Sequence, residues 1–345
     1  MPKRFIFMGV FALIIAVAAW AVAASWQQRQ AERLGQTDNE AAAVVAVDEP
    51  VSVVVSLFPW YDLAKEIGGE RVTATLLLPP GVEAHAFEPT PNDMINISRA
   101  QLFVYTGDYM EPWAKDLLAS LGTETPDSLV IGEGLAVLNS VAEHEHEDEI
   151  MAVENNQLSV EEEREHEHEG LDPHIWLDPM IMSKAAGRMA QKLAQLDPEG
   201  SAYYNARLEN YQTRLEVLDE KYRHSLSQCE YQDFIYAGHY AFGYLADRYQ
   251  LHYEAAQGFS PDAESSPQRL VQLAELLKNQ AGEYVFAEEL DNPQLAEALA
   301  KESGVKILRL NSAHNLSKAD LRSGLSYLEI MANNLETLSL GLKCQ

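Results

Sequence analysis

Basic residues are scarce in this sequence. Its 345 residues include 25 Lys and Arg against 53 Asp and Glu, which gives a formal net charge of −28 at pH 7. Because binding to nucleic acid needs a basic face, this balance argues against a nucleic-acid partner. An acidic surface concentrates cations instead, although over most of a protein it simply maintains solubility. The length is sufficient for two domains with a sizeable core.

Cysteine is also rare, with only Cys229 and Cys344 in the whole chain. In an exported protein an isolated pair predicts one disulfide, which here would tie the end of the chain to the start of its second half. The alternative is a pair of buried free thiols. Export is itself predicted, so we favour the disulfide.

The first 50 residues have the pattern of an export signal followed by a spacer. Lys3 and Arg4 precede an apolar run from Phe5 to about Ala24, and AVAAS (21–25) offers small residues to a signal peptidase. We expect a signal peptide at 1–24 and a solvated spacer at 25–50, with the mature protein in the periplasm. The run is long enough for an uncleaved membrane anchor, which is the alternative.

The region 51–196 has the pattern of an α/β lobe. Short apolar runs that precede a turn and a helix are typical of buried parallel strands, and they occur at 51–57, 72–78 and 101–107. Thr90, Pro91 and Asp93 predict the start of one helix through a capping box, and Asp178-Pro179 predicts another.

A second α/β lobe is expected at 228–345, with strands at 233–238, 283–289 and 305–310. Ser317 is expected to start a final helix that runs toward the C-terminus. Between the lobes, 197–227 contains no Gly or Pro after Gly200 and would form a rigid helix of roughly 40 Å. The predicted fold class is therefore α/β, with two lobes built on parallel sheets, joined by a long helix and separated by a cleft.

Three histidines occupy a similar context. His85, His174 and His239 each lie just after a predicted strand or just before a predicted helix. In open α/β sheets the carboxyl ends of the strands line the ligand crevice. Neutral imidazole is a common ligand of zinc, so the three rings predict a metal site there. One such histidine alone would more often be a cap or a surface residue.

Five motifs carry a family resemblance, in the order HAFEPTPNDM, LFVYTGDYMEPW, DPHIWLDP, GHYAFGYLADRY and GFSPDAESSPQRL. Together they resemble the solute-binding proteins of zinc and manganese ABC importers over residues 50–345. The resemblance implies two βα lobes joined by a rigid helix, with the metal in the cleft. His85, His174 and His239 fall on the family's ligand positions. Manganese-preferring members tend to have a carboxylate as third ligand, so His239 favours Zn²⁺ over Mn²⁺.

The expected fourth ligand departs from the family pattern. An acidic ligand often follows the last strand, but RLNSAHNLS has Asn311 at that place. We favour His314 as the substitute, with Glu288 or a water molecule as alternatives.

An insertion at 139–170 precedes DPHIWLDP and is rich in His and acidic residues. It contains EHEHEDE and EEEREHEHE and is too charged to bury a core, so it is predicted to be disordered. Similar tracts are typical of zinc members of the family. Its four histidines predict weak zinc binding that raises the local zinc concentration, so that the tract acts as a metal collector. The alternative is a solubilising insertion.

The function expected from these patterns is zinc uptake without catalysis. The protein would be a monomer that captures Zn²⁺ with high affinity and delivers it to an inner-membrane ABC permease with its ATPase. The alternatives are a manganese-type binding protein, a zinc hydrolase, and a metal-storage or surface adhesion protein. A hydrolase also needs a general base. Glu83 and Glu88 lie near a ligand in sequence, and nothing marks either as a base.

Overall fold

The computed structural model describes residues 49–135, 171–259, 265–279, 282–289 and 293–345. The predicted signal peptide or anchor, nearly all of the spacer and the acidic insertion therefore lie outside the described residues. Pro50–Gln345 forms one structural unit. Within the described ranges, no helix is both long and apolar enough to span a membrane.

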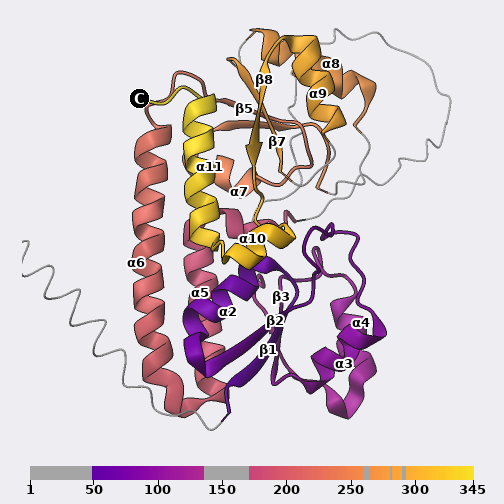
Figure 1. Cartoon of the computed structure of the whole chain (residues 1–345), viewed down its shortest axis with the longest axis vertical. Coiled ribbons are helices and arrows are strands. Elements are labelled where there is room, and N and C mark those ends of the chain that lie inside the picture. The colour runs from indigo at the N-terminus through magenta and orange to yellow at the C-terminus, as the bar shows by residue number, and fades with distance from the viewer. Residues whose placement is uncertain (1–48, 136–170, 260–264, 280–281, 290–292) are drawn as a thin grey trace, which may run out of the picture. The chain divides into compact units, whose positions relative to one another are not determined.

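The first sheet has four parallel strands in the order β2-β1-β3-β4. Figure 1 labels three of them, β1, β2 and β3. Its strands are β1 (Val51–Val55), β2 (Val72–Leu76), β3 (Leu102–Tyr105) and β4 (Asp127–Val130). The helices of this lobe are α2 (Phe58–Gly68), α3 (Pro91–Arg99) and α4 (Ala114–Leu121). Val53 and Val55 pack into the core that contains α2, whereas Val54 packs into the core of α3 and α4. The sheet is thus covered on both faces.

The second sheet repeats this arrangement in the order β6-β5-β7-β8. Its strands are β5 (Asp233–Tyr236), β6 (His252–Ala255), β7 (Tyr284–Glu288) and β8 (Lys306–Leu310). The helices that follow its strands are α7 (Gly243–Tyr249), α8 (Pro267–Asn279) and α9 (Gln294–Ser303). In both sheets the strand order reverses beside the first strand of the lobe, and ligands bind at such a switch point in open α/β sheets.

Two edge strands, β4 and β6, were not predicted from the sequence. Their sequences are DSLV and HYEA, and each begins with an exposed residue. An edge strand is only partly covered, so it tolerates polar residues and lacks the continuous apolar run by which a buried strand is recognised.

The helical layer contains α5 (Pro179–Leu196), α6 (Ser201–Leu226), α10 (Lys318–Ser323) and α11 (Tyr327–Gly341). Helix α6 is the longest of these and packs against α5, α2 and α11 (Figure 1). The prediction that this helix begins at Asp197-Pro198 was wrong by one turn. Asp197 instead caps the 3-10 turn η4 (Pro198–Gly200) and forms an ion pair with Arg71 at 2.7 Å. The other 3-10 turns are η1 (Gly69–Arg71), η2 (Gly122–Glu124) and η3 (Ile175–Leu177).

The predicted final helix is divided in two. Gly324 has a φ of +77°, a left-handed conformation that ends α10. Ser326 and Glu329 then form a capping box that starts α11. The predicted disulfide is present between Cys229 and Cys344, which lie after α6 and α11 respectively.

Candidate metal centre

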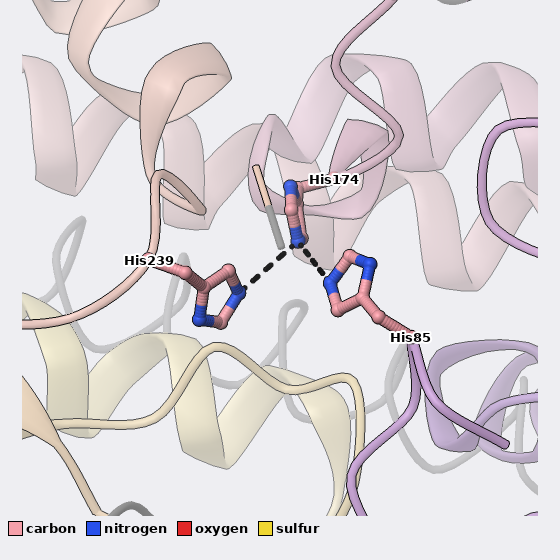
Figure 2. Close-up of side chains that lie close together, drawn as sticks. All are labelled: His85, His174 and His239. Carbon is pink, nitrogen blue, oxygen red and sulfur yellow. Dashed lines mark hydrogen bonds between the residues drawn. The ribbon is translucent and has the colours of Figure 1, made fainter. Parts of the chain in front are cut away.

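Three imidazole rings from separate segments meet in the structure. One ring nitrogen from each of His85, His174 and His239 lies within 4.8 Å of the other two. Figure 2 shows the three rings directing nitrogens toward one another. Across the described residues, this is the one group of His, Cys, Asp and Glu side chains with such geometry.

His85 is carried by a short segment between β2 and α3. A turn precedes it, in which the N–H of Val82 donates to the carbonyl of Pro79 at 3.1 Å, and Gly81 supplies the φ of +81°. Around His85 itself, the carboxylate of Glu83 accepts the N–H of Ala86 at 2.8 Å. The capping box at the start of α3 fixes the far end of the segment.

His174 lies at the start of η3, directly before α5. The carboxylate of Asp178 caps α5 by accepting the N–H groups of Met180 and Ile181. The indole of Trp176 donates to the carbonyl of Ser312 at 2.7 Å and so ties the same segment to the loop after β8. His174 is thereby held between the two lobes.

Asp172 orients the ring of His174. Its Oδ1 atom accepts the backbone N–H of His174 at 2.9 Å and lies 2.7 Å from Nδ1 of the same residue. A proton on Nδ1 therefore leaves the lone pair on Nε2, the nitrogen that faces His85 and His239. Both residues are buried, which prevents water from competing for this contact.

Burial sets the charge of the site. It lowers the pKa of His174 and of His239 well below the usual value, and repulsion from the neighbouring imidazoles lowers both further. The two rings are thus neutral at pH 7 and offer lone pairs to a cation. Burial raises the pKa of Asp172 well above its usual value. A proton on Oδ2 would still leave Oδ1 able to accept from Nδ1, so the tautomer of His174 does not depend on that charge.

His239 follows β5 at the point where the strand order of the second sheet reverses. The adjacent N–H of Tyr240 donates to the carbonyl of Gly258 at 2.8 Å, which holds the loop in place. His239 is 1% exposed and His174 is fully buried. Two of the three rings are therefore closed to bulk water.

The distances between the rings fit a tetrahedral ion. The Nε2 atom of His174 lies 3.2 Å from that of His85 and 3.3 Å from that of His239. Two nitrogens bound to one zinc ion at about 2.0–2.1 Å, with a tetrahedral angle between them, are also separated by about 3.3 Å. Hydrogen bonding satisfies this cluster poorly, because Nε2 of His174 has one lone pair and two nitrogens facing it. A cation would use all three lone pairs.

His314 lies beside this group and is not part of it. Its ring centre is 6.0 Å from that of His239, and its Nδ1 atom is hydrogen-bonded to the Ser312 hydroxyl. It is 6% exposed, so it shares the buried environment of the other rings.

The alternative positions for the fourth ligand have other contacts. Glu288 accepts the hydroxyl of Tyr236 at 2.6 Å and the N–H of Ser312 at 3.2 Å. The side chain of Asn311 donates to Glu289 and accepts the N–H of Ala313. Neither Glu288 nor Asn311 belongs to the three-histidine group.

The contribution of Asp172 was missed in the sequence. It lies two residues before His174, a spacing at which an Asp side chain commonly accepts the backbone N–H of its neighbour. That signal was available in DPHIWLDP. The contact with the ring, however, also requires burial of both side chains, which the motif alone does not reveal.

Sequence relatives of this chain are named for zinc uptake or zinc binding. The family model described as "Zinc-uptake complex component A periplasmic" (ZnuA) matches residues 53–341. The chain is 34% identical over 290 residues to the high-affinity zinc uptake system protein ZnuA of Bacillus subtilis, covering 84% of this chain and 87% of that protein. It is 32% identical over 330 residues to the zinc-binding protein AdcA of Streptococcus pyogenes serotype M3, covering 95% of this chain and 61% of that protein.

Solved structures show the same two-lobed fold. AdcAII of Streptococcus pneumoniae superposes with a TM-score of 0.71 at 27% identity, covering 86% of this chain and 100% of that one. The Zn(II)-bound ZnuA-like domain of Streptococcus pneumoniae AdcA superposes with a TM-score of 0.67 at 29% identity, covering 85% and 99%. The laminin-binding protein Lmb of Streptococcus agalactiae is described as having adhesin and metal-transporting activity. It superposes with a TM-score of 0.68 at 28% identity, covering 85% of this chain and 99% of that one.

These findings confirm both the predicted fold class and the resemblance drawn from the five motifs. The family match extends over both sheets and includes all three clustered histidines. The chain therefore belongs to the ZnuA family of periplasmic zinc-uptake complex components.

Proposed function

We propose that this protein captures Zn²⁺ outside the inner membrane and delivers it to the permease of an ABC-type importer. The observation that carries the proposal is the convergence of three Nε2 atoms at separations of 3.2 and 3.3 Å, in a cluster where two of the rings are buried. The family membership and the zinc-uptake names of the relatives support the same function.

The proposed ligands are His85, His174 and His239, with His314 as the fourth. His314 supports this role by its burial and by its place next to His239. A closed set of four protein ligands is typical of zinc sites that hold the ion without reacting it.

Zinc is the proposed cargo rather than manganese because the three clustered ligands are nitrogens. Imidazole suits zinc, whereas manganese favours carboxylate and other oxygen ligands. The carboxylate of Asp172 is bonded to Nδ1 of His174, on the side away from Nε2, and so does not take the place of a nitrogen ligand.

Catalysis is not part of the proposal. A zinc hydrolase keeps an open coordination position, a substrate pocket and a base beside the metal. Glu83 is hydrogen-bonded to the N–H of Ala86 and Glu88 is exposed. The burial of His174 and His239 also argues against access by a substrate larger than an ion.

Delivery requires that the ion leave after docking. His85 comes from the first lobe and His239 from the second, so a modest movement of one lobe would separate ligands and weaken binding. The proposed setting is a periplasmic monomer, either released after signal cleavage or held by its N-terminal segment. Loss of the protein is expected to impair growth only when zinc is scarce.

The test is equilibrium competition between Zn²⁺ and Mn²⁺ for the purified, metal-stripped mature protein, with the bound metals counted. We expect one tight zinc per chain and a strong preference for zinc. Equal affinity for the two ions would contradict the cargo assignment. The absence of any tight site would contradict the function itself.

A further inference from the structure

The loop after β8 crosses from the second lobe to the first. It comprises residues 311–316, and all six are at most 8% exposed. The carbonyl of His314 accepts the N–H of Phe58 at 3.3 Å, across the lobes. Ala313 adopts a φ of +59°, a left-handed conformation rarely used by residues other than glycine. Such a conformation persists where the surrounding contacts determine the backbone.

The side chain of Asn315 makes two polar contacts with the first lobe. Its amide nitrogen donates to the carbonyl of Pro79 at 2.9 Å and to that of Val82 at 2.6 Å. Its Oδ1 atom accepts the N–H of Leu316 at 2.7 Å, which fixes the orientation of the amide. Asn315 is 2% exposed, so these bonds are shielded from water and costly to leave unmade.

The two acceptors are the ends of the turn that precedes His85. Val82 also donates to Pro79 within that turn, so Asn315 closes it from outside. Only Glu83 and Ala84 lie between Val82 and His85, and they accept short-range hydrogen bonds from the N–H groups of Ala86 and Phe87 respectively. The turn is thus joined to the second lobe through the side chain of Asn315.

We propose that Asn315 is a positioning residue for zinc binding, acting through the segment that carries His85. It holds this segment against the second lobe, and thereby keeps Nε2 of His85 at 3.2 Å from Nε2 of His174. Because the contact joins the two lobes, its loss releases one ligand of the site and leaves the other two in place. The inference rests on the proposed zinc-binding function.

The first experiment measures the position of the segment without metal. Hydrogen exchange of the metal-free Asn315→Ala protein is compared with that of wild type at the amides of Val82, Ala86 and Phe87. We expect exchange about tenfold faster at these amides, as the loss of two buried hydrogen bonds predicts. Unchanged exchange there would overturn the proposal whether or not the protein binds zinc.

The second experiment measures zinc release into excess chelator. We expect Asn315→Ala to release zinc about tenfold faster than wild type. If Asn315 acts through His85, the double variant Asn315→Ala/His85→Ala should release zinc no faster than His85→Ala alone. If the effects of Asn315→Ala and His85→Ala on the rate of zinc release were additive, Asn315 would not act through His85. The same conclusion would follow if Asn315→Ala were non-additive with His314→Ala only, and either result would overturn the proposal.

The matched control is Asn334→Ala. Asn334 is also a buried asparagine bonded to this loop, through the N–H and carbonyl of Asn311, and both of these partners lie in the second lobe. We expect it to change zinc release less than twofold. If Asn334→Ala accelerated zinc release equally, the general integrity of the loop would matter and the contact of Asn315 with Pro79 and Val82 would not.

Should Asn315→Ala fold poorly, Asn315→Asp is the second variant. It keeps the shape of the side chain and the bond from the N–H of Leu316, but it removes the donor. Its exchange at Val82, Ala86 and Phe87 then decides the question.

Discussion

At the level of single residues, the proposed zinc site depends on individual nitrogen atoms. His85, His174 and His239 approach one another through Nε2, and each ring has one lone pair to offer a cation. We expect His85→Ala, His174→Ala and His239→Ala each to weaken tight zinc binding by at least about tenfold, since a decade is 1.4 kcal/mol and the loss of a ligand should exceed it.

Chelator competition measures this effect. His252→Ala is a suitable control, because the side chain of His252 is 77% exposed and its contact is with Asp233. A variant of any one of the three with wild-type affinity would remove that histidine from the site.

A second residue-level feature is the buried carboxyl of Glu111. Its Oε1 atom accepts the hydroxyls of Ser56 and Thr106, and its Oε2 atom accepts the N–H groups of Thr106 and Gly107. Burial raises the pKa of Glu111 from 4.5 to about 7, although these hydrogen bonds act in the opposite direction. The folded state therefore binds this proton more tightly than the unfolded state does.

The sign of the pH dependence follows. The contribution of Glu111 to the free energy of unfolding is fully present below pH 4.5 and is lost as pH rises to about 7. The shift corresponds to a loss of about 3 kcal/mol over that range. Glu111→Gln should remove this loss, because a glutamine Nε2 at the place of Oε1 can donate to the Ser56 hydroxyl as the protonated acid would.

Urea unfolding of metal-free protein at several pH values tests the prediction. The difference between wild type and Glu111→Gln should grow from pH 4.5 to 7. Glu133→Gln, at an exposed position, should follow the wild-type curve. Parallel curves for wild type and Glu111→Gln would contradict the prediction.

At the scale of elements, the disulfide ties the chain after α6 to the chain after α11. Cys229 and Cys344 are 115 residues apart and also form an isolated β-bridge. A cross-link that closes such a long loop restricts the unfolded chain, and chain-entropy models give about 4–5 kcal/mol, often less in practice. We expect the double variant Cys229→Ser/Cys344→Ser to be less stable by up to this amount.

The measurement is urea unfolding of the double variant, of both single variants and of wild type with and without reductant. Zinc affinity under native conditions should change little, because neither α6 nor α11 carries a proposed ligand. Two free thiols in the unreduced wild-type protein, found by mass analysis, would contradict the disulfide.

At the scale of the whole molecule, the acidic insertion lies outside the described residues, but its attachment points do not. Residues up to 135 and from Leu171 onward are described, and Leu171 lies directly before Asp172 and close to His174. We expect deletion of residues 140–169 to leave the tight site intact and to remove additional weak zinc equivalents. The tract is predicted from its sequence to be disordered, and such a chain loses entropy when it binds an ion, so we expect it to bind zinc more weakly than the three-histidine group does.

Calorimetric zinc titration of both forms distinguishes the outcomes. The weak equivalents should fade first as pH falls below about 6.5, where free histidine becomes charged. Loss of the tight phase on deletion would show that the tract supplies a ligand. Identical total zinc in both forms would show that it is only a solvated insertion.

Features that depend on neighbouring residues could be predicted from the sequence. The capping box at Thr90 and Asp93 and the cap at Asp178 are local hydrogen bonds, and both are present as predicted. The buried strands were also recognisable, because a strand covered on both faces must be apolar throughout. His85, His174 and His239 could be selected because each follows or precedes such an element.

How these elements pack together depends on contacts between residues that are distant in sequence. The edge strands β4 and β6 carry weak local signals, and the break at Gly324 divides a helix that was predicted as a single helix from Ser317 onward. The contact of Asn315 with Pro79 and Val82 spans more than 230 residues of sequence. The meeting of the three rings depends likewise on the packing of two lobes. Such contacts are set by burial of surfaces distant in sequence, which no local pattern encodes.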